Sequence, residues 1–309
     1  RIAARAENRI RHIVSADDLI LLTSGGEWKV APQNSDLLTP DSAWPKQVGT
    51  EGAANVQPAL TSGSIIYVQE AGSRLREMRY KWENNGYSIN DISIMAPHLF
   101  DGYTILDLAY QKTPYKMIWC VRSDGVLLGL TYLPEHDVVG WHEHDTDGLF
   151  ESVACVKEGT EHFLYAVVKR SINGRDVRYI ERKRSRFFTD RADAFFVDAG
   201  STYDGSAATT IGGLWHLEGE EVAVLADGAE HPRCTVSGGS ITLEASASVV
   251  QIGLPITAEL ETLPLTLELP AFGQGMTKNV NEVALRLQDT SGIEVGPSFE
   301  DADMVEVTQ

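Results

Sequence analysis

Two histidines that alternate along a predicted strand are the residues in this sequence best suited to hold a metal ion. His142 and His144 lie in the segment Trp141-His142-Glu143-His144-Asp145. Side chains two apart in a strand project to the same face, so both imidazoles could reach one ion. Zinc sites use at least three protein ligands, however, and the local sequence marks no third one. We therefore expect no metal at this pair, and no cofactor elsewhere.

The acidic residues suggest two further candidate sites. The first is a calcium loop that starts at Glu143, and the second is a glycosidase site formed by two carboxylates. Counted from Glu143, position 12 of a calcium loop would be Ala154 instead of the bidentate glutamate that such a loop needs. A turn at Asp147-Gly148 accounts for that segment. Glycosidases need two carboxylates at a set separation, and among 44 acidic residues no pair is marked by its surroundings.

Motifs of enzymes are also missing from the sequence. It contains no GxSxG nucleophile elbow, no GxxxxGK[ST] phosphate loop and no GxGxxG segment after a strand. We expect no catalysis. One alternative stays open, a β-propeller that binds or cleaves carbohydrate, in which Trp141 beside Glu143 would supply an aromatic platform and an acid.

A basic stretch between residues 169 and 191 is the strongest candidate for a contact surface. This stretch contains nine basic residues and only three acidic ones, Asp176, Glu181 and Asp190. The surface could contact phosphate or an acidic partner, and a solvated strand face is the plain alternative. Because the rest of the chain is acidic, we favour an intersubunit contact. The residues are Lys169, Arg170, Arg175, Arg178, Arg182, Lys183, Arg184 and Arg186, followed by Arg191.

The charge of the chain argues against non-specific nucleic-acid binding. The formal net charge is −18, and residues 201–309 hold only three basic side chains against 17 acidic ones. Affinity for DNA of any sequence comes from neutralising phosphates with Lys and Arg. An acidic surface of this kind would repel DNA and favour solubility.

Length and composition indicate a folded protein of two or three domains. The 309 residues are 43% hydrophobic, which suffices for ordinary cores. No run approaches the roughly 18 apolar residues of a membrane span. The three cysteines, Cys120, Cys155 and Cys234, show no CxxC spacing, and the first two lie in apolar strand patterns, so buried free thiols and assembly in a reducing cytoplasm are expected. Because the chain starts at Arg1 without a Met, we expect a fragment of a longer protein.

The elements that must position these residues are repeated β-hairpins. Four segments each contain an apolar strand, a turn with Gly and a second strand, and their turn glycines, Gly25, Gly72, Gly125 and Gly174, are 47, 53 and 49 residues apart. Asp-Gly and Asn-Gly are strong hairpin turns. A period near 50 is typical of propeller blades. The predicted hairpin strands are 19–22 with 27–30, 65–68 with 75–80, 117–121 with 126–132, and 163–168 with 177–180, and a later strand covers 137–142.

Aromatic residues recur in these repeats, and we expect Tyr67, Trp119 and Tyr165 to fill the layers between blades. The segment Ile2–Ile13 is ambiguous between helix and strand. Residues 201–213 are rich in small and turn-forming types and predict a linker.

Beyond the linker, short strands with frequent Gly turns predict a small β-sandwich or barrel at about 212–262. The strands are expected at 221–225, 233–236, 241–243 and 249–254. Pro264–Gly275 predicts another linker, and Val280–Leu287 alternates like a last strand that could return to the propeller. The predicted fold is thus all-β, with propeller blades over 1–205, a small inserted sandwich or barrel over 206–270 and a strand segment over 271–309.

Several segments together resemble the tail nozzle, or tail tubular, proteins of short-tailed bacteriophages. The resemblance covers about 1–200 well and 212–262 more loosely, and it depends on strand sequences without catalytic motifs. It is carried by Leu22–Trp28, Arg74–Tyr80, Asp91–Phe100, Trp119–Tyr132, Tyr179–Arg182, Leu217–Val222, Gly253–Pro255 and 278–296.

The resemblance implies a structural role with no catalytic residues. Members of this family form a ring, commonly a hexamer, stacked with other tail proteins around the channel that double-stranded DNA crosses during ejection. The implied location is the virion tail, assembled in the bacterial cytoplasm, with no membrane contact. A lumen with little positive charge would keep phosphate contacts few, so that DNA passes without specific binding.

Overall fold

The computed structural model describes residues 8–33, 37–262, 279–287, 292–300 and 303–307. The chain forms two compact units, Arg1–Ile256 and Thr257–Gln309. Throughout the described ranges the regular structure consists of β-strands and single-turn 3-10 helices, without an α-helix, so the predicted all-β class is confirmed. The 3-10 turns are η1 (Trp82–Asn84), η2 (Pro97–Leu99), η3 (Pro134–His136), η4 (Arg191–Asp193) and η5 (Trp215–Leu217).

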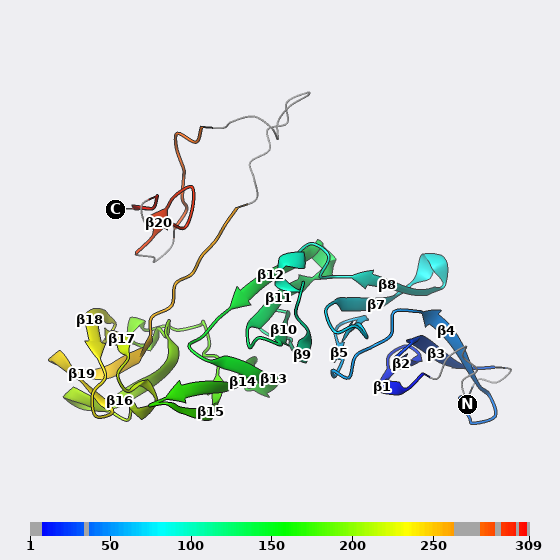
Figure 1. Cartoon of the computed structure of the whole chain (residues 1–309), viewed down its shortest axis with the longest axis horizontal. Coiled ribbons are helices and arrows are strands. Elements are labelled where there is room, and N and C mark those ends of the chain that lie inside the picture. Colours follow the sequence, from blue (N-terminus) through cyan, green and yellow to red (C-terminus); the bar gives the residue numbers. More distant parts are fainter. Residues whose placement is uncertain (1–7, 34–36, 263–278, 288–291, 301–302, 308–309) are drawn as a thin grey trace. The chain divides into compact units, whose positions relative to one another are not determined.

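Three four-stranded antiparallel sheets make up the first part of the larger unit (Figure 1). In each sheet the strands lie side by side in the order in which they follow in the sequence, as in propeller blades. Sheet one holds β1 (Ile10–Ser15), β2 (Leu19–Thr23), β3 (Gly26–Pro32) and β4 (Ala43–Gly49). Sheet two holds β5 (Ala59–Leu60), β6 (Ser64–Val68), β7 (Leu75–Lys81) and β8 (Gly86–Asp91). Sheet three holds β9 (Ile105–Gln111), β10 (Met117–Arg122), β11 (Leu127–Leu133) and β12 (Val138–His144).

The fourth sheet has three strands, β13 (Leu149–Glu158), β14 (Glu161–Ile172) and β15 (Arg175–Arg182), in that order. All four predicted hairpins are present, as β2–β3, β6–β7, β10–β11 and β14–β15. In the last of them, Asn173 (φ 51°) and Gly174 (φ 71°) both adopt the positive φ that a tight primed turn needs. The ambiguous N-terminal segment is a strand from Ile10 onward, and residues 1–7 lie outside the described part.

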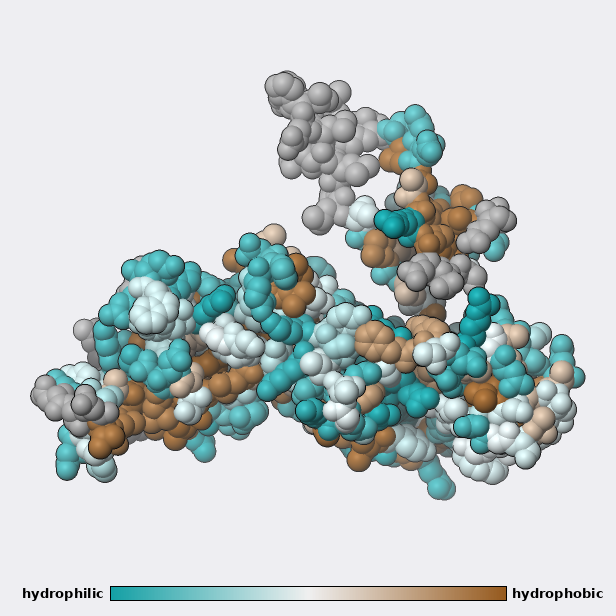
Figure 2. Space-filling view, turned by 180° about the vertical axis from the view of Figure 1, so that it is seen from behind, coloured by the Kyte–Doolittle hydropathy of each residue, from teal (hydrophilic) through white to brown (hydrophobic). Residues whose placement is uncertain are grey.

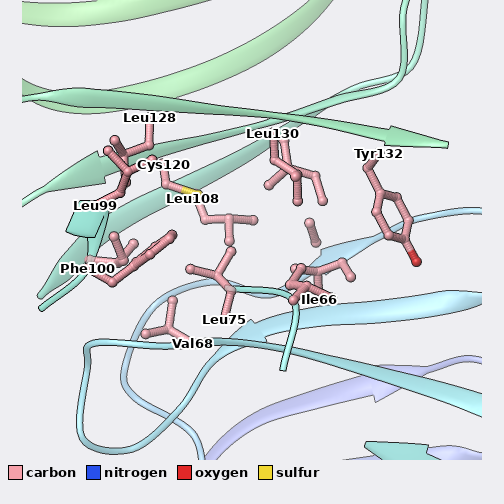
Figure 3. Close-up of a cluster of buried hydrophobic side chains, with 14 of the residues drawn as sticks. Ile66, Val68, Leu75, Leu99, Phe100, Leu108, Cys120, Leu128, Leu130 and Tyr132 are labelled. Atoms are coloured by element: carbon pink, nitrogen blue, oxygen red, sulfur yellow. The ribbon is translucent and has the colours of Figure 1, made fainter. Parts of the chain in front are cut away.

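Successive sheets pack face to face through buried apolar side chains. Sheets two and three share the largest cluster, in which Ile66, Val68 and Leu75 meet Leu108 and Leu130 (Figure 3). A second cluster joins sheets one and two, and a third joins sheets three and four. A lone hairpin is marginal in water, so each sheet gains its stability from this stacking.

Two of the three predicted aromatic residues lie in these layers. Tyr67 is buried between sheets one and two, and Trp119 is buried between sheets three and four. The prediction for Tyr165 is wrong. Side chains alternate along β14, and the face that packs on sheet three carries Leu164, Ala166 and Val168, which leaves Tyr165 half-buried on the other face.

Each layer between sheets also contains a carboxylate that accepts a hydrogen bond from the neighbouring sheet. Tyr67 Oη donates to Glu27 Oε1 at 2.8 Å, and Tyr132 Oη donates to Glu77 Oε1. Between sheets three and four, Ser152 Oγ donates to Asp107 Oδ2 at 2.6 Å. Apolar faces can slide over each other, whereas a buried acceptor must meet its donor, so these contacts fix the register of the stack.

The rest of the larger unit is a fifth antiparallel sheet, in the order β16-β19-β17-β18, with an apolar cluster of its own. Its strands are β16 (Asp198–Gly212), β17 (Glu221–Ala226), β18 (Ala229–Thr235) and β19 (Ser240–Leu254). The predicted linker at 201–213 is wrong, since those residues belong to β16 up to Gly212 and pair with β19. The domain boundary expected between residues 205 and 206 therefore falls within β16. The two strands predicted at 241–243 and 249–254 are one strand, β19.

The described residues of the smaller unit contain one two-stranded ladder, β20 (Glu294–Val295) with β21 (Val305–Glu306). The strand predicted over Val280–Leu287 is wrong, because residues 279–287 have no regular secondary structure. Alternation alone does not make a strand without a partner edge. The linker predicted at Pro264–Gly275 lies outside the described residues.

Candidate functional site

The predicted basic stretch runs along β14 and β15 and into the segment that follows. Four of its members are neutralised within the chain by carboxylates on β13 and β15. These ion pairs are Lys169 with Asp176 (2.7 Å), Arg170 with Glu181 (2.6 Å), Arg178 with Glu151 (2.6 Å) and Arg182 with Glu158 (2.8 Å). About half of the stretch thus stabilises its own sheet.

Arg170 is not available to a partner. It is 4% exposed and donates to both Glu181 oxygens, at 2.6 and 2.8 Å, and to the Asp147 carbonyl at 2.7 Å. Its position on the inner face of β14 follows from the alternation of that strand. Sequence reasoning grouped Arg170 with its neighbours because composition does not show which face a side chain occupies.

Three cations beyond β15 lie over aromatic rings. Lys183 Nζ is 4.2 Å from the centre of the Trp119 ring. The Arg184 guanidinium is 5.4 Å from the Phe195 ring and that of Arg186 is 5.0 Å from the Tyr115 ring. None of the three forms an ion pair with a described carboxylate, and neither does the exposed Arg175. Arg191 also has no ion pair with a described carboxylate, so these five residues are the free part of the predicted surface.

Exposed aromatic side chains follow the same cations along the chain. Phe187 is 60% exposed and stacks on Tyr115, with the ring centres 6.4 Å apart, and Phe188 contacts Phe196 edge to face. Figure 2 shows that hydrophobic residues form patches between hydrophilic ones on the molecular surface. Arginine together with aromatic residues is enriched in protein interfaces. The segment after β15 therefore has the composition of a contact surface.

A small pocket lies beside these cations, between the loop before β10 and the segment after β15. It has a volume of about 30 Å³, which is about the space of one water molecule. Its lining residues are Gln111, Pro114, Tyr115, Met117, Glu161, His162, Phe163, Leu164, Lys183, Arg184, Ser185 and Arg186.

The two histidines lie on the face of sheet three that packs on sheet four. His142 Nδ1 and His144 Nε2 are 2.7 Å apart, at hydrogen-bonding distance, and both rings contact Trp119. Gly129 lies between Trp119 and His142 in the ladder, and a Cβ there would be 2.0 Å from His142 Cε1. The glycine thus provides the space for the imidazole.

Burial lowers the pKa of both imidazoles. Removal from water is the largest cause, and the charges of Lys183 and Arg186 add to it, so that the pKa of His144 falls to about 3. Within the described residues no group of three or more His, Cys, Asp or Glu side chains is placed to hold a metal ion. The pair is therefore a neutral, mutually hydrogen-bonded part of the layer between sheets.

All three cysteines are less reactive than an ordinary thiol. All three are free, Cys120 being fully buried and Cys155 half-buried. Burial raises the pKa of all three thiols, that of Cys155 to about 12. The free state agrees with the sequence prediction, although Cys155 is less buried than expected.

The pair proposed for a sugar site, Trp141 and Glu143, is engaged within the protein. Trp141 is half-buried, donates from Nε1 to the Ile92 carbonyl at 2.8 Å and meets Phe100 edge to face. Glu143 accepts from Arg122 at 3.2 Å. Trp141 therefore forms no open platform for a sugar, and the Glu143 carboxylate already pairs with Arg122.

A different aromatic site was missed by sequence reasoning. Trp82, in the turn after β7, is 84% exposed and contacts Tyr80 edge to face, with ring centres 5.5 Å apart. The two rings line an open pocket with Arg79, Lys81 and Glu83. The sequence signal for this aromatic site is the dense run of aromatic and charged residues at 79–83, which spans the end of β7 and the turn after it.

Comparison with known proteins adds no family. No protein family model matches the sequence, and no curated protein matches it either. As a separate observation, no helix in the described residues has the length and hydrophobicity needed to cross a membrane.

Proposed function

We propose that this chain is a structural, non-enzymatic component of a bacteriophage tail, a nozzle or tubular ring subunit around the DNA channel. The observation that carries the proposal is the face-to-face stack of meander sheets. Such a stack is the arrangement of propeller blades, which the sequence resemblance leads us to expect. The virion tail would be its location, and further copies and other tail proteins its partners.

The free cations support an intersubunit contact in this proposal. In a ring each subunit presents one surface to a different surface of its neighbour. Arg175 and the cations after β15 lack ion pairs with the described carboxylates of their own chain, while residues 201–309 carry 17 acidic and three basic side chains. Complementary charge would steer this contact and set its register.

Negative-stain microscopy of the purified full-length protein, combined with light scattering, tests the proposal. The expected result is annular particles of uniform diameter whose subunits dissociate as salt is raised, because exposed charges are screened beyond about 10 Å at 0.1 M salt. A monomer at every concentration and salt condition would contradict the proposal.

A second candidate, a carbohydrate-binding module, is favoured by one observation, the open pocket at Trp82 and Tyr80. Exposed aromatic rings offer an apolar face for stacking, and Glu83 offers a hydrogen-bond acceptor. Binding of soluble polysaccharides, measured by affinity electrophoresis on the wild type and on Trp82→Ala, tests it. Retardation that the substitution abolishes supports this candidate, and unchanged migration in every polysaccharide contradicts it.

A further inference from the structure

The pocket after β15 is lined by basic groups whose charge is not balanced. Lys183 backbone N–H donates to the Leu164 carbonyl at 2.9 Å, and the Lys183 side chain lies over Trp119, with Nζ 4.2 Å from the ring centre. Lys183, Arg184 and Arg186 all line the pocket, and none forms an ion pair with a described carboxylate. A partly buried cation without a counter-charge is costly, and an anion would remove that cost.

Lys183 and Arg186 line the same pocket, so their positive charges repel each other. The pKa of Lys183 falls to about 8, first because of burial and second because of the Arg186 guanidinium. Lys183 and Arg186 in turn lower the pKa of His142 and His144. An anion near Lys183 would oppose each of these effects.

The acid in the pocket does not balance this charge. Glu161 lines the pocket, and its two carboxylate oxygens accept from Ser185 Oγ at 3.1 and 3.0 Å. His162, also in the lining, has its Nδ1 2.7 Å from Thr113 Oγ1. The pocket is thus lined by three cations and by the single carboxylate of Glu161, which already accepts hydrogen bonds from Ser185. The positive charge exceeds the negative charge.

The aromatic rings leave the donors of the cations free. Trp119 lies under Lys183 and Tyr115 under Arg186, 5.0 Å from its guanidinium. A guanidinium that lies over a ring keeps its N–H groups pointing outward in its own plane, where they can form bidentate hydrogen bonds to an oxyanion. The rings therefore hold both cations in place before any ligand arrives.

We propose that this pocket is a binding site for a small free oxyanion of the phosphate type, held between Lys183 and Arg186. The ammonium group acts as a point charge and the guanidinium as a bidentate donor. Because Arg186 is exposed, the anion would lie at the open mouth of the pocket, with Lys183 on its inner side. The inference is independent of any role in a phage tail.

Isothermal titration of the full chain with inorganic phosphate at pH 7, against sodium chloride at matched ionic strength, tests the site. We expect saturable binding of phosphate at one site, weakened at least tenfold in Lys183→Met and in Arg186→Met. Arg175→Met is the matched control, since this exposed cation lies outside the pocket and should bind as the wild type does. Arg186 is exposed, so its substitution should leave folding intact even if that of Lys183 does not.

Three results would overturn the proposal. The first is a phosphate titration that does not differ from the chloride titration. The second is equal binding by the Arg186→Met and Arg175→Met variants. The third is binding of duplex DNA that depends on Arg186 without any binding of free phosphate, which would make this surface a nucleic-acid contact instead.

Discussion

The Tyr67 hydroxyl donates a 2.8 Å hydrogen bond to Glu27 Oε1, which joins sheet two to sheet one inside a buried layer. Glu27 is fully buried, and its other carboxylate oxygen has no hydrogen-bond partner among the described residues. Burial is the largest influence on this carboxyl group and raises its pKa above the usual value of 4.5. The pair therefore specifies how two sheets meet and at the same time places a carboxyl group where its charged form is costly.

Removal of the Tyr67 hydroxyl should destabilise the protein. Tyr67→Phe leaves a buried acceptor without its donor, and we expect a loss of about 1–3 kcal/mol in the free energy of unfolding. Tyr110→Phe is the control, since the Tyr110 hydroxyl makes no hydrogen bond to a described residue. Urea denaturation of both variants measures the difference, and equal stabilities would show that the hydrogen bond does not hold the sheets together.

The Glu27 carboxyl group should make stability depend on pH. Its folded-state pKa is raised, so the folded protein binds this proton more tightly than the unfolded chain does. The contribution to stability is fully present below the unfolded pKa and is lost as pH rises through the folded pKa. Glu27→Gln should therefore gain stability relative to the wild type as pH rises from about 4.5 to 7. A constant difference in denaturation midpoint over that range would contradict the raised pKa.

Gly129 should be intolerant of even one methyl group. Gly129→Ala would place its Cβ 2.0 Å from His142 Cε1, in a layer where Trp119 and His144 prevent the ring from moving. We expect a cost of about 1–3 kcal/mol, as for other overpacked cores. Gly140→Ala on β12 is a matched control, because a Cβ there meets no atom within 4 Å. Thermal unfolding should separate the two, and equal melting temperatures would refute the packing argument.

His144 should stay neutral in mildly acidic solution. Burial holds its pKa near 3, so the imidazole resists protonation in the folded state. Because this pKa is lower than in the unfolded chain, stability should fall as pH drops below about 6.5. Nitrogen-detected NMR of the imidazole from pH 7 to 4 should show no titration of His144. A midpoint near 6.5 would show that the ring is hydrated and the layer open.

Charge reversal at basic residues that have no ion pair in their own chain should weaken ring assembly. The same number of charge reversals at other exposed sites should have less effect. Arg182 is a poor choice because it pairs with Glu158, so we select Arg175→Glu with Arg184→Glu. The control is Lys46→Glu with Lys157→Glu, which makes the same change in net charge at two exposed sites. Light scattering should show fewer rings for the first variant and normal rings for the second. Equal assembly would remove the basic stretch from the interface.

The sequence by itself determined the hairpins of this protein, because a hairpin depends on neighbouring residues. Asn173-Gly174 sets a primed turn through positive φ at both positions, and the apolar strands on either side follow from it. The alternation of β14 is equally visible in the sequence. The presence of the basic stretch, the His142 and His144 pair and the free cysteines could also be read directly from residue types.

Only the tertiary structure decided which of these residues face which neighbours. Arg170 and Lys169 are adjacent in the chain, yet one is buried against Glu181 and the other pairs on the outer face with Asp176. Residues 201–212, with the small side chains typical of a linker, become a strand because β19 supplies a partner edge, whereas Val280–Leu287 alternates well and stays irregular. The pocket at Lys183 and Arg186 exists because the loop before β10, which carries Tyr115, meets the segment after β15. Turn geometry is local and is encoded by two or three residues, whereas burial, pairing and charge balance arise between residues far apart in the chain, and no local pattern specifies them.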